Sequence, residues 1–96
     1  MPTYISLLRW TAQGVQSLKD SPSRLDAARK SFAAAGVRLK DFYMVTGQYD
    51  LVVVCEAPDY TAMAKAMLVV ASHGNVHSET LRAFTEDEYR GIVSGL

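Results

Sequence analysis

Apolar positions along this chain follow two different periods, one typical of strands and one typical of helices. Strict alternation indicates strands whose side chains point to opposite faces of a sheet, whereas apolar residues that recur at three- and four-residue intervals indicate helices that bury one face. The pattern predicts strands at residues 3–10, 37–46, 50–57 and 75–84, a helical region at 11–35, a helix at 60–73 and a short helix after residue 85. The order of elements is therefore β-α-β-β-α-β with an additional C-terminal helix.

Capping and turn residues support these boundaries. Thr11 can cap a helix through its hydroxyl, and Ser21-Pro22 interrupts the first helical region as a second helix start. Gly47 lies in a three-residue connection that is typical of a hairpin between the second and third strands. Thr85 and Glu88 have the spacing of a capping box, in which each side chain accepts a hydrogen bond from the other residue's backbone N–H. The last helix therefore has a defined first turn.

This order predicts one domain, residues 1–96, with a ferredoxin-like α+β fold. Two βαβ units with right-handed crossovers place the four strands in an antiparallel sheet of spatial order 4-1-3-2. Both long helices then lie on one face of the sheet, and the C-terminal helix is additional to this βαββαβ core.

Several strands are apolar on both faces, which two helices on one face cannot cover. In the first strand Leu7 points away from Leu8. In the third strand Val52 and Val54 point away from Val53. A second subunit's sheet is the favoured cover and would give at least a homodimer of the dimeric α+β barrel type. The alternative is a monomer in which the C-terminal helix covers the second face.

The composition excludes several classes of protein. Ten Lys and Arg balance ten Asp and Glu, so a basic surface for nucleic acid or an anionic membrane is not expected. The single cysteine, Cys55, excludes an intramolecular disulfide and a cysteine-built zinc site, and it suits a reducing compartment. The start of the chain lacks the pattern of a signal peptide, and no apolar run has the length needed to cross a bilayer. We therefore expect a cytoplasmic protein with no nucleic-acid or membrane partner.

The chain contains no standard catalytic or nucleotide-binding motif. His73 and His77 are four residues apart, but Gly74 ends the predicted helix between them, which disfavours a metal site on this pair. His77 and Glu79 share one face of the last strand, where an exposed polar edge explains them. Cys55 lies in a valine-rich strand and is expected to serve packing. No catalytic residue, metal site or cofactor is therefore predicted.

Five residues bring polar or aromatic groups to apolar surroundings and are the candidate ligand-binding residues: Arg9, Tyr43, Tyr49, Asp50 and His73. Arg9 lies in a central strand, where its guanidinium must pair with an anion or reach solvent. We expect its partner to be a carboxylate of the chain in preference to a carboxylate of a ligand. Tyr49 could stack on a ligand and Asp50 could accept a hydrogen bond, with Tyr43 as a wall. His73 would be a titratable group. Each also has a structural explanation, such as a hairpin turn for Asp50 and a helix C-terminus for His73.

Four segments resemble the GYD domain family: Tyr4 to Trp10, Thr11-x-x-Gly14, Pro22 to Arg29, and Gly47-x-Tyr49-Asp50 with the apolar strand that follows. The resemblance covers nearly the whole chain. Membership implies a bacterial protein with a ferredoxin-like domain related to the dimeric α+β barrels. The family has no established general activity or catalytic residues to carry over. The stretch from Gly47 to Val54 is also similar to the effector-binding domain of leucine-responsive-type transcription regulators, which bind amino acids at subunit interfaces.

These features favour an oligomeric protein that binds a small polar or amino-acid-like metabolite at a subunit interface without catalysis. The alternative is a small dimeric α+β barrel enzyme, similar in topology to cofactor-free monooxygenases and haem-degrading enzymes. A third possibility is that assembly itself is the function.

Overall fold

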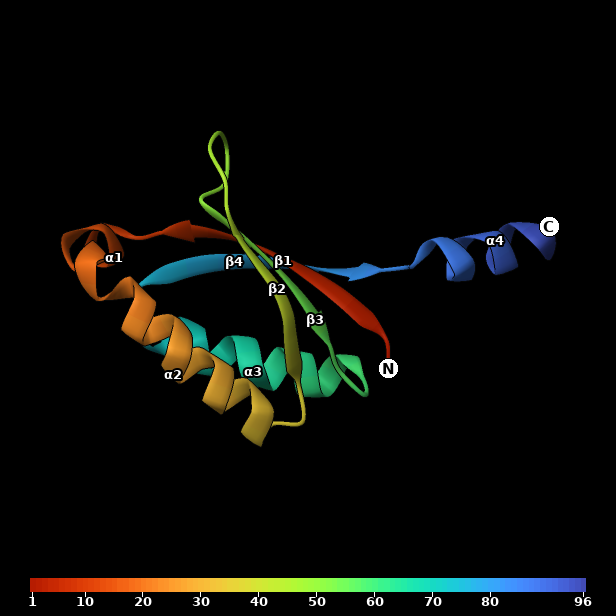
Figure 1. The fold of residues 1–96 in the computed structure, drawn as a ribbon, viewed down its shortest axis with the longest axis horizontal. Coiled ribbons are helices and arrows are strands. Elements are labelled where there is room, and N and C mark those ends of the chain that lie inside the picture. Colours follow the sequence, from red (N-terminus) through yellow and green to blue (C-terminus); the bar gives the residue numbers. More distant parts are fainter.

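The computed structural model describes residues 1–96 as a four-stranded antiparallel sheet with the two long helices on one face (Figure 1). The strands are β1 (Thr3–Trp10), β2 (Arg38–Met44), β3 (Leu51–Glu56) and β4 (Val76–Ala83). The helices are α1 (Ala12–Gln16), a 3₁₀ turn (Leu18–Asp20), α2 (Ser21–Ala34), α3 (Tyr60–Ser72) and α4 (Glu86–Ser94). All the predicted strands and helices are present. Strand β1 has the predicted bounds, and the other three strands begin and end one or two residues inside the predicted limits.

The strand order is β2-β3-β1-β4, which is the predicted order 4-1-3-2 read from the other edge. Every neighbouring pair is antiparallel. The register places Ser6 of β1 opposite Val53 of β3 on one side and opposite Thr80 of β4 on the other. Side chains directly opposite one another share a face, so the register settles which residues lie on each side of the sheet. The ferredoxin-like topology is therefore confirmed.

The hydrophobic core lies between the sheet and helices α2 and α3. Alternate residues of β1 are buried there, and one of them, Ser6, satisfies its hydroxyl by a 2.9 Å hydrogen bond with the Thr80 hydroxyl. The buried apolar residues are Tyr4, Leu8, Phe32, Val37, Val53, Cys55, Ala57, Met63, Ala66 and Met67. Each central strand thus contributes one alternating set of side chains to the core.

Hydrogen bonds at the start of α1 link the end of β1 to the turn between α3 and β4. The Thr11 hydroxyl accepts from the Gly14 N–H at 3.1 Å, which confirms the predicted cap, and it donates to the Gly74 carbonyl at 2.6 Å. The Thr11 N–H donates to the Asn75 carbonyl at 3.0 Å. A Cβ atom added at Gly14 would lie 2.2 Å from that same carbonyl oxygen. Only glycine therefore permits this close approach.

The opposite face of the sheet carries no helix, and we call it the open face. One row of directly opposed residues across it is Tyr43, Val52, Leu7 and Glu79, and the next is Asp41, Val54, Ile5 and Leu81. Tyr43 is 56% exposed and Leu81 is 43% exposed. The central strands are thus apolar on both sides, as predicted, and the open face is an apolar surface without a cover.

Helix α4 projects away from the sheet and does not cover the open face (Figure 1). The apolar residues of α4, Tyr89, Ile92 and Val93, are exposed, as is Leu96 after the helix. The alternative in which the C-terminal helix covers the second face of a monomer is therefore wrong. The chain forms no helix with an apolar stretch that could span a bilayer.

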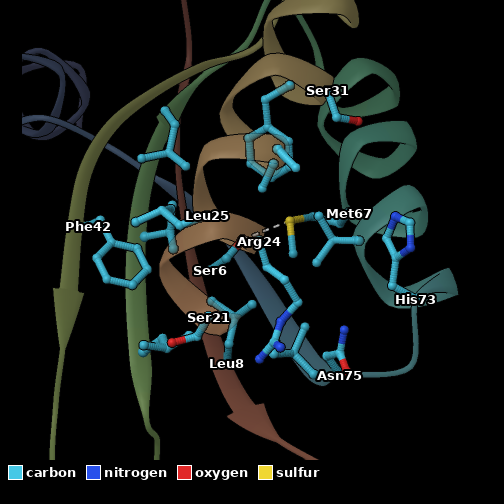
Figure 2. Close-up of a pocket in the computed structure, with 18 of the residues that line it drawn as sticks. Ser6, Leu8, Ser21, Arg24, Leu25, Ser31, Phe42, Met67, His73 and Asn75 are labelled. Atoms are coloured by element: carbon cyan, nitrogen blue, oxygen red, sulfur yellow. Dashed lines mark hydrogen bonds between the residues drawn. The ribbon is translucent and has the colours of Figure 1, made fainter. Parts of the chain in front are cut away.

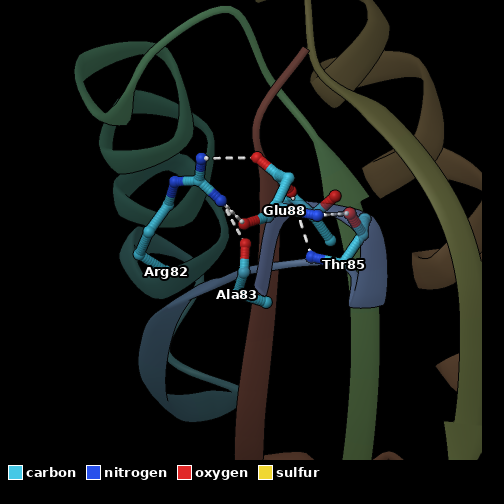
Figure 3. A network of polar contacts seen from close by, with 5 residues as sticks. Arg82, Ala83, Thr85 and Glu88 are labelled. Atoms are coloured by element: carbon cyan, nitrogen blue, oxygen red, sulfur yellow. Dashed lines mark hydrogen bonds and ion pairs between the residues drawn. The ribbon is translucent and has the colours of Figure 1, made fainter. Parts of the chain in front are cut away.

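The predicted capping box at the start of α4 is confirmed (Figure 3). The Thr85 N–H donates to the Glu88 carboxylate at 3.0 Å, and the Glu88 N–H donates to the Thr85 hydroxyl at 3.2 Å. Arg82 of β4 donates to the Ala83 carbonyl and pairs with the Glu88 carboxylate at 3.4 Å. These contacts fix the first turn of α4 to the end of β4. At α2, by contrast, Ser21 is the first helical residue rather than the cap, which is Asp20.

Candidate functional site

The hairpin between β2 and β3 carries the candidate residues Tyr49 and Asp50. Gly47 gives the loop its left-handed turn, with φ at 115°. The Asp50 N–H donates to the Leu8 carbonyl at 2.9 Å, and the Asp50 carboxylate accepts from the Trp10 N–H at 3.0 Å. Asp50 therefore ties the hairpin to the end of β1, and this carboxylate oxygen is engaged by the backbone.

Tyr49, Arg9 and Glu79 form a polar cluster at the hairpin end of the open face, which we call the rim cluster. The Arg9 guanidinium carbon lies 4.9 Å from the centroid of the Tyr49 ring. The Tyr49 hydroxyl donates to the Glu79 carboxylate at 2.8 Å. Arg9 is opposite His77, and Glu79 is opposite Leu7, so both point from the open face. Three separate elements, β1, the hairpin and β4, thus meet here.

The charges of the rim cluster are complementary to one another. The hydrogen bond to Glu79 raises the pKa of Tyr49, since it favours the protonated phenol, and the Arg9 charge acts in the opposite direction with smaller effect. Arg9 takes part in none of the three ion pairs. The expectation that a carboxylate of the chain pairs with Arg9 is therefore wrong. Its partner is the face of an aromatic ring, a weak attraction at an exposed site.

The other candidate residues lie apart from this cluster. Tyr43 is on the open face of β2, in the row that continues through Val52 and Leu7 to Glu79. His73 is the C-terminal cap of α3, on the helix side of the sheet, where it lines a cavity between the helices and the sheet. The structure thus brings Arg9 and Tyr49 together, leaves Tyr43 on the same face and separates His73.

Glu79 belongs to the rim cluster but was outside the candidate set. The signal that could have found it is the strand order, because an edge strand next to β1 places its alternate polar positions beside Arg9. The sequence pattern does not predict the path of the hairpin. That path places the Tyr49 ring against Arg9 and the Tyr49 hydroxyl against Glu79.

The chemistry available to the rim cluster is binding by charge and hydrogen bond. The Arg9 guanidinium can donate to an anion, and the Glu79 carboxylate can accept from a cation. Cys55 is fully buried in the core, and burial raises the pKa of its thiol to about 11, which disfavours the reactive thiolate. No group of three His, Cys, Asp or Glu side chains is close enough together to hold a metal ion.

Comparison with known proteins defines the family. The GYD domain model matches residues 4–93. The chain belongs to the GYD domain family. This GYD domain is 40% identical over 84 residues to a Thermus thermophilus protein named glutamine synthetase and cystathionine beta-lyase binding protein, across 86% of this chain and 88% of the relative.

Solved structures share the fold of this GYD domain. A crystal structure of a Thermus thermophilus protein superposes with a TM-score of 0.57 at 26% identity, covering 88% of this chain and 95% of the other. FFRP-DM1 gives a TM-score of 0.59 at 21% identity, over 88% of this chain and 100% of the other. A hypothetical protein from Pyrococcus horikoshii gives 0.56 at 22% identity, over 90% and 93%.

Proposed function

We propose that this protein is a non-catalytic binding protein that pairs with a second copy through its open face and, in that form, binds a metabolic enzyme. The observation that carries the self-association is that the open face is apolar across its central strands while α4, the remaining element of the chain, projects away from it. An apolar sheet face needs a second layer to exclude water. A symmetric sheet-on-sheet pair supplies that layer without another kind of chain.

The surface area supports this proposal. The accessible surface of the chain is 6263 Å². A folded monomer of 10.5 kDa exposes roughly 5,400 Å², so the chain exposes an excess of roughly 900 Å². One partner in a stable protein interface contributes about 800 Å². The exposed apolar residues of the open face and of α4 contribute to this excess, and an assembly would bury them.

The enzyme partner is suggested by the Thermus relative, whose name states that it binds glutamine synthetase and cystathionine beta-lyase. We take these two enzymes as the first candidates for this chain. The proposed contact is the apolar stripe of α4, because Tyr89, Ile92 and Val93 stay exposed on a helix that projects beyond the sheet. Exposed aromatic and aliphatic side chains of this kind are typical anchors of protein interfaces.

Biolayer interferometry with each immobilised enzyme from the same organism tests this proposal. We expect wild-type protein to bind one of the two enzymes, and Ile92→Asp to abolish that binding. The matched control is Asp87→Ala, which alters α4 away from the stripe and should bind as wild type. The proposal of an enzyme partner is overturned if neither enzyme binds, and the α4 contact is overturned if both variants bind equally.

The rim cluster favours a second candidate function, the binding of an amino-acid-like ligand. Arg9 has no ion-pair partner and could bind a carboxylate, while Glu79 could accept hydrogen bonds from an ammonium group. Calorimetry with the proteinogenic amino acids tests this function. Arg9→Gln should abolish binding, whereas Arg38→Gln, which removes an arginine already paired with Glu56 at 3.1 Å, should not. Equal affinities in the two variants would exclude the rim cluster as the site.

A further inference from the structure

A cavity of about 380 Å³ lies on the helix side of the sheet, between the sheet and helices α2 and α3 (Figure 2). Its walls are mainly apolar and include Leu8, Leu25, Phe32, Phe42, Met67 and Val70. The sheet separates this cavity from the open face and the rim cluster. It is therefore independent of the surfaces that carry the proposed function.

The buried polar groups of the cavity walls already have hydrogen-bond partners within the chain. Ser6, at the floor, already bonds to the Thr80 hydroxyl at 2.9 Å and to the Met67 sulfur at 3.6 Å. No buried side-chain nitrogen or oxygen of the chain lacks a hydrogen-bond partner. The body of an occupant thus needs no polar groups, and an apolar one gains most from entering.

The ionisable residues of the cavity are basic. Arg24 and His73 are its basic residues, and none of the residues that line it is acidic. Figure 2 shows Arg24 of α2, with His73 and Asn75 from the end of α3 and the turn after it, around one end of the cavity. The chain thus places a cation at one end of an apolar space without a carboxylate to neutralise it.

Arg24 is held in place by neutral acceptors. It donates to the Ser17 carbonyl at 2.8 Å and to the Ser17 hydroxyl at 3.0 Å, and more weakly to the Gly14 carbonyl at 3.5 Å. These bonds orient the guanidinium but leave its charge uncompensated, since Arg24 forms no ion pair. A preoriented cation recognises an anion at lower entropic cost than a mobile side chain does.

We infer that this cavity binds a small monocarboxylic acid with an apolar body, its carboxylate at Arg24 and its body among the apolar walls. The volume corresponds to about a dozen non-hydrogen atoms, taking roughly 30 Å³ for each as for liquid water. A medium-chain fatty acid or an aryl-substituted short acid has this size and chemistry. The carboxylate supplies the charge that the cavity lacks, and the body removes apolar surface from water.

Isothermal titration calorimetry with octanoate tests the inference, with octan-1-ol and octylamine as ligands of matched body and different head. Wild-type protein should bind octanoate at least about tenfold more tightly than octanol, because a hydrogen bond to a charged group contributes that much, and should bind octylamine most weakly. This comparison needs no variant. Equal binding of the three ligands, or no binding of octanoate, would overturn the inference.

Two variants then locate the site. Arg24→Gln should weaken octanoate binding about tenfold and leave octanol binding unchanged, since only the charged contact is lost. Arg29→Gln, an exposed residue of the same helix that does not line this cavity, is the control and should bind octanoate as wild type. Ala28→Phe, which fills the cavity, should abolish binding of both ligands. Octanoate affinity that is the same in Arg24→Gln and Arg29→Gln would contradict the assignment.

Discussion

Replacement of Leu81 by alanine should weaken self-association without affecting the core. Leu81 points from the open face of β4, directly opposite Ile5 of β1, and is 43% exposed. Burying a whole leucine side chain contributes about 2 kcal/mol, so the exposed part contributes about 0.9 kcal/mol when a second sheet covers it. A two-fold symmetric interface contains this residue twice, which gives about 1.7 kcal/mol, or roughly a 20-fold rise in the dimer dissociation constant.

Sedimentation velocity over a concentration series measures this constant for wild type and for Leu81→Ala. The matched control is Leu68→Ala, because Leu68 is 69% exposed on α3 and lies outside the open face. The control should have the wild-type dissociation constant. If the two leucine variants dissociate equally, the open face is not the interface and the reasoning from its apolar rows fails.

Three further predictions concern local structure. Gly14→Ala should lower the free energy of unfolding by about 2 kcal/mol, because the added methyl group meets a backbone carbonyl. Thermal denaturation should then show a Tm lower by roughly 10 °C. The control is Gly91→Ala in α4, which has open space around it and should leave the Tm unchanged. Asp50→Ala should cost about 1–2 kcal/mol in urea unfolding, because the Trp10 N–H loses its acceptor; an unchanged midpoint would show that the hairpin is not tied to β1. The hydrogen bond from the Thr85 backbone N–H lowers the pKa of Glu88. Its stabilising contribution is therefore fully present above the unfolded value of 4.5 and is lost as the pH falls through the lowered pKa of the folded protein. Circular dichroism should accordingly show helix lost on acidification in wild type and less change in Glu88→Gln.

The fold was predictable because its signals are local. The Thr11 cap, the Gly47 hairpin and the Thr85 capping box each lie within a few residues of the boundary that they mark. The βαββαβ order then allows few arrangements once crossovers are right-handed. The apolar residues on both faces of β1 and β3 also predicted the open face before its register was known.

The site was predictable only in part, because its contacts depend on paths that no local pattern records. Arg9 and Tyr49 were both candidates, but their contact arises from the course of the hairpin, and Glu79 joins them from a strand far along the chain. His73 was grouped with them, yet the C-terminus of α3 lies on the other side of the sheet. The direction of α4 was equally open, since an amphipathic helix indicates only that it has an apolar side.

Hydroxyl-radical footprinting of side chains shows whether a second copy of the chain covers the open face. The oxidation rates of Leu81 and Tyr43 measure the exposure of the open face. Leu68 on α3 is the internal reference, because it has the same side chain as Leu81. We predict that oxidation of Leu81 and Tyr43 slows as the protein concentration rises from the low to the high micromolar range, while oxidation of Leu68 stays constant. If the oxidation rates of Leu81 and Tyr43, like that of Leu68, do not change with concentration, no second copy covers the open face.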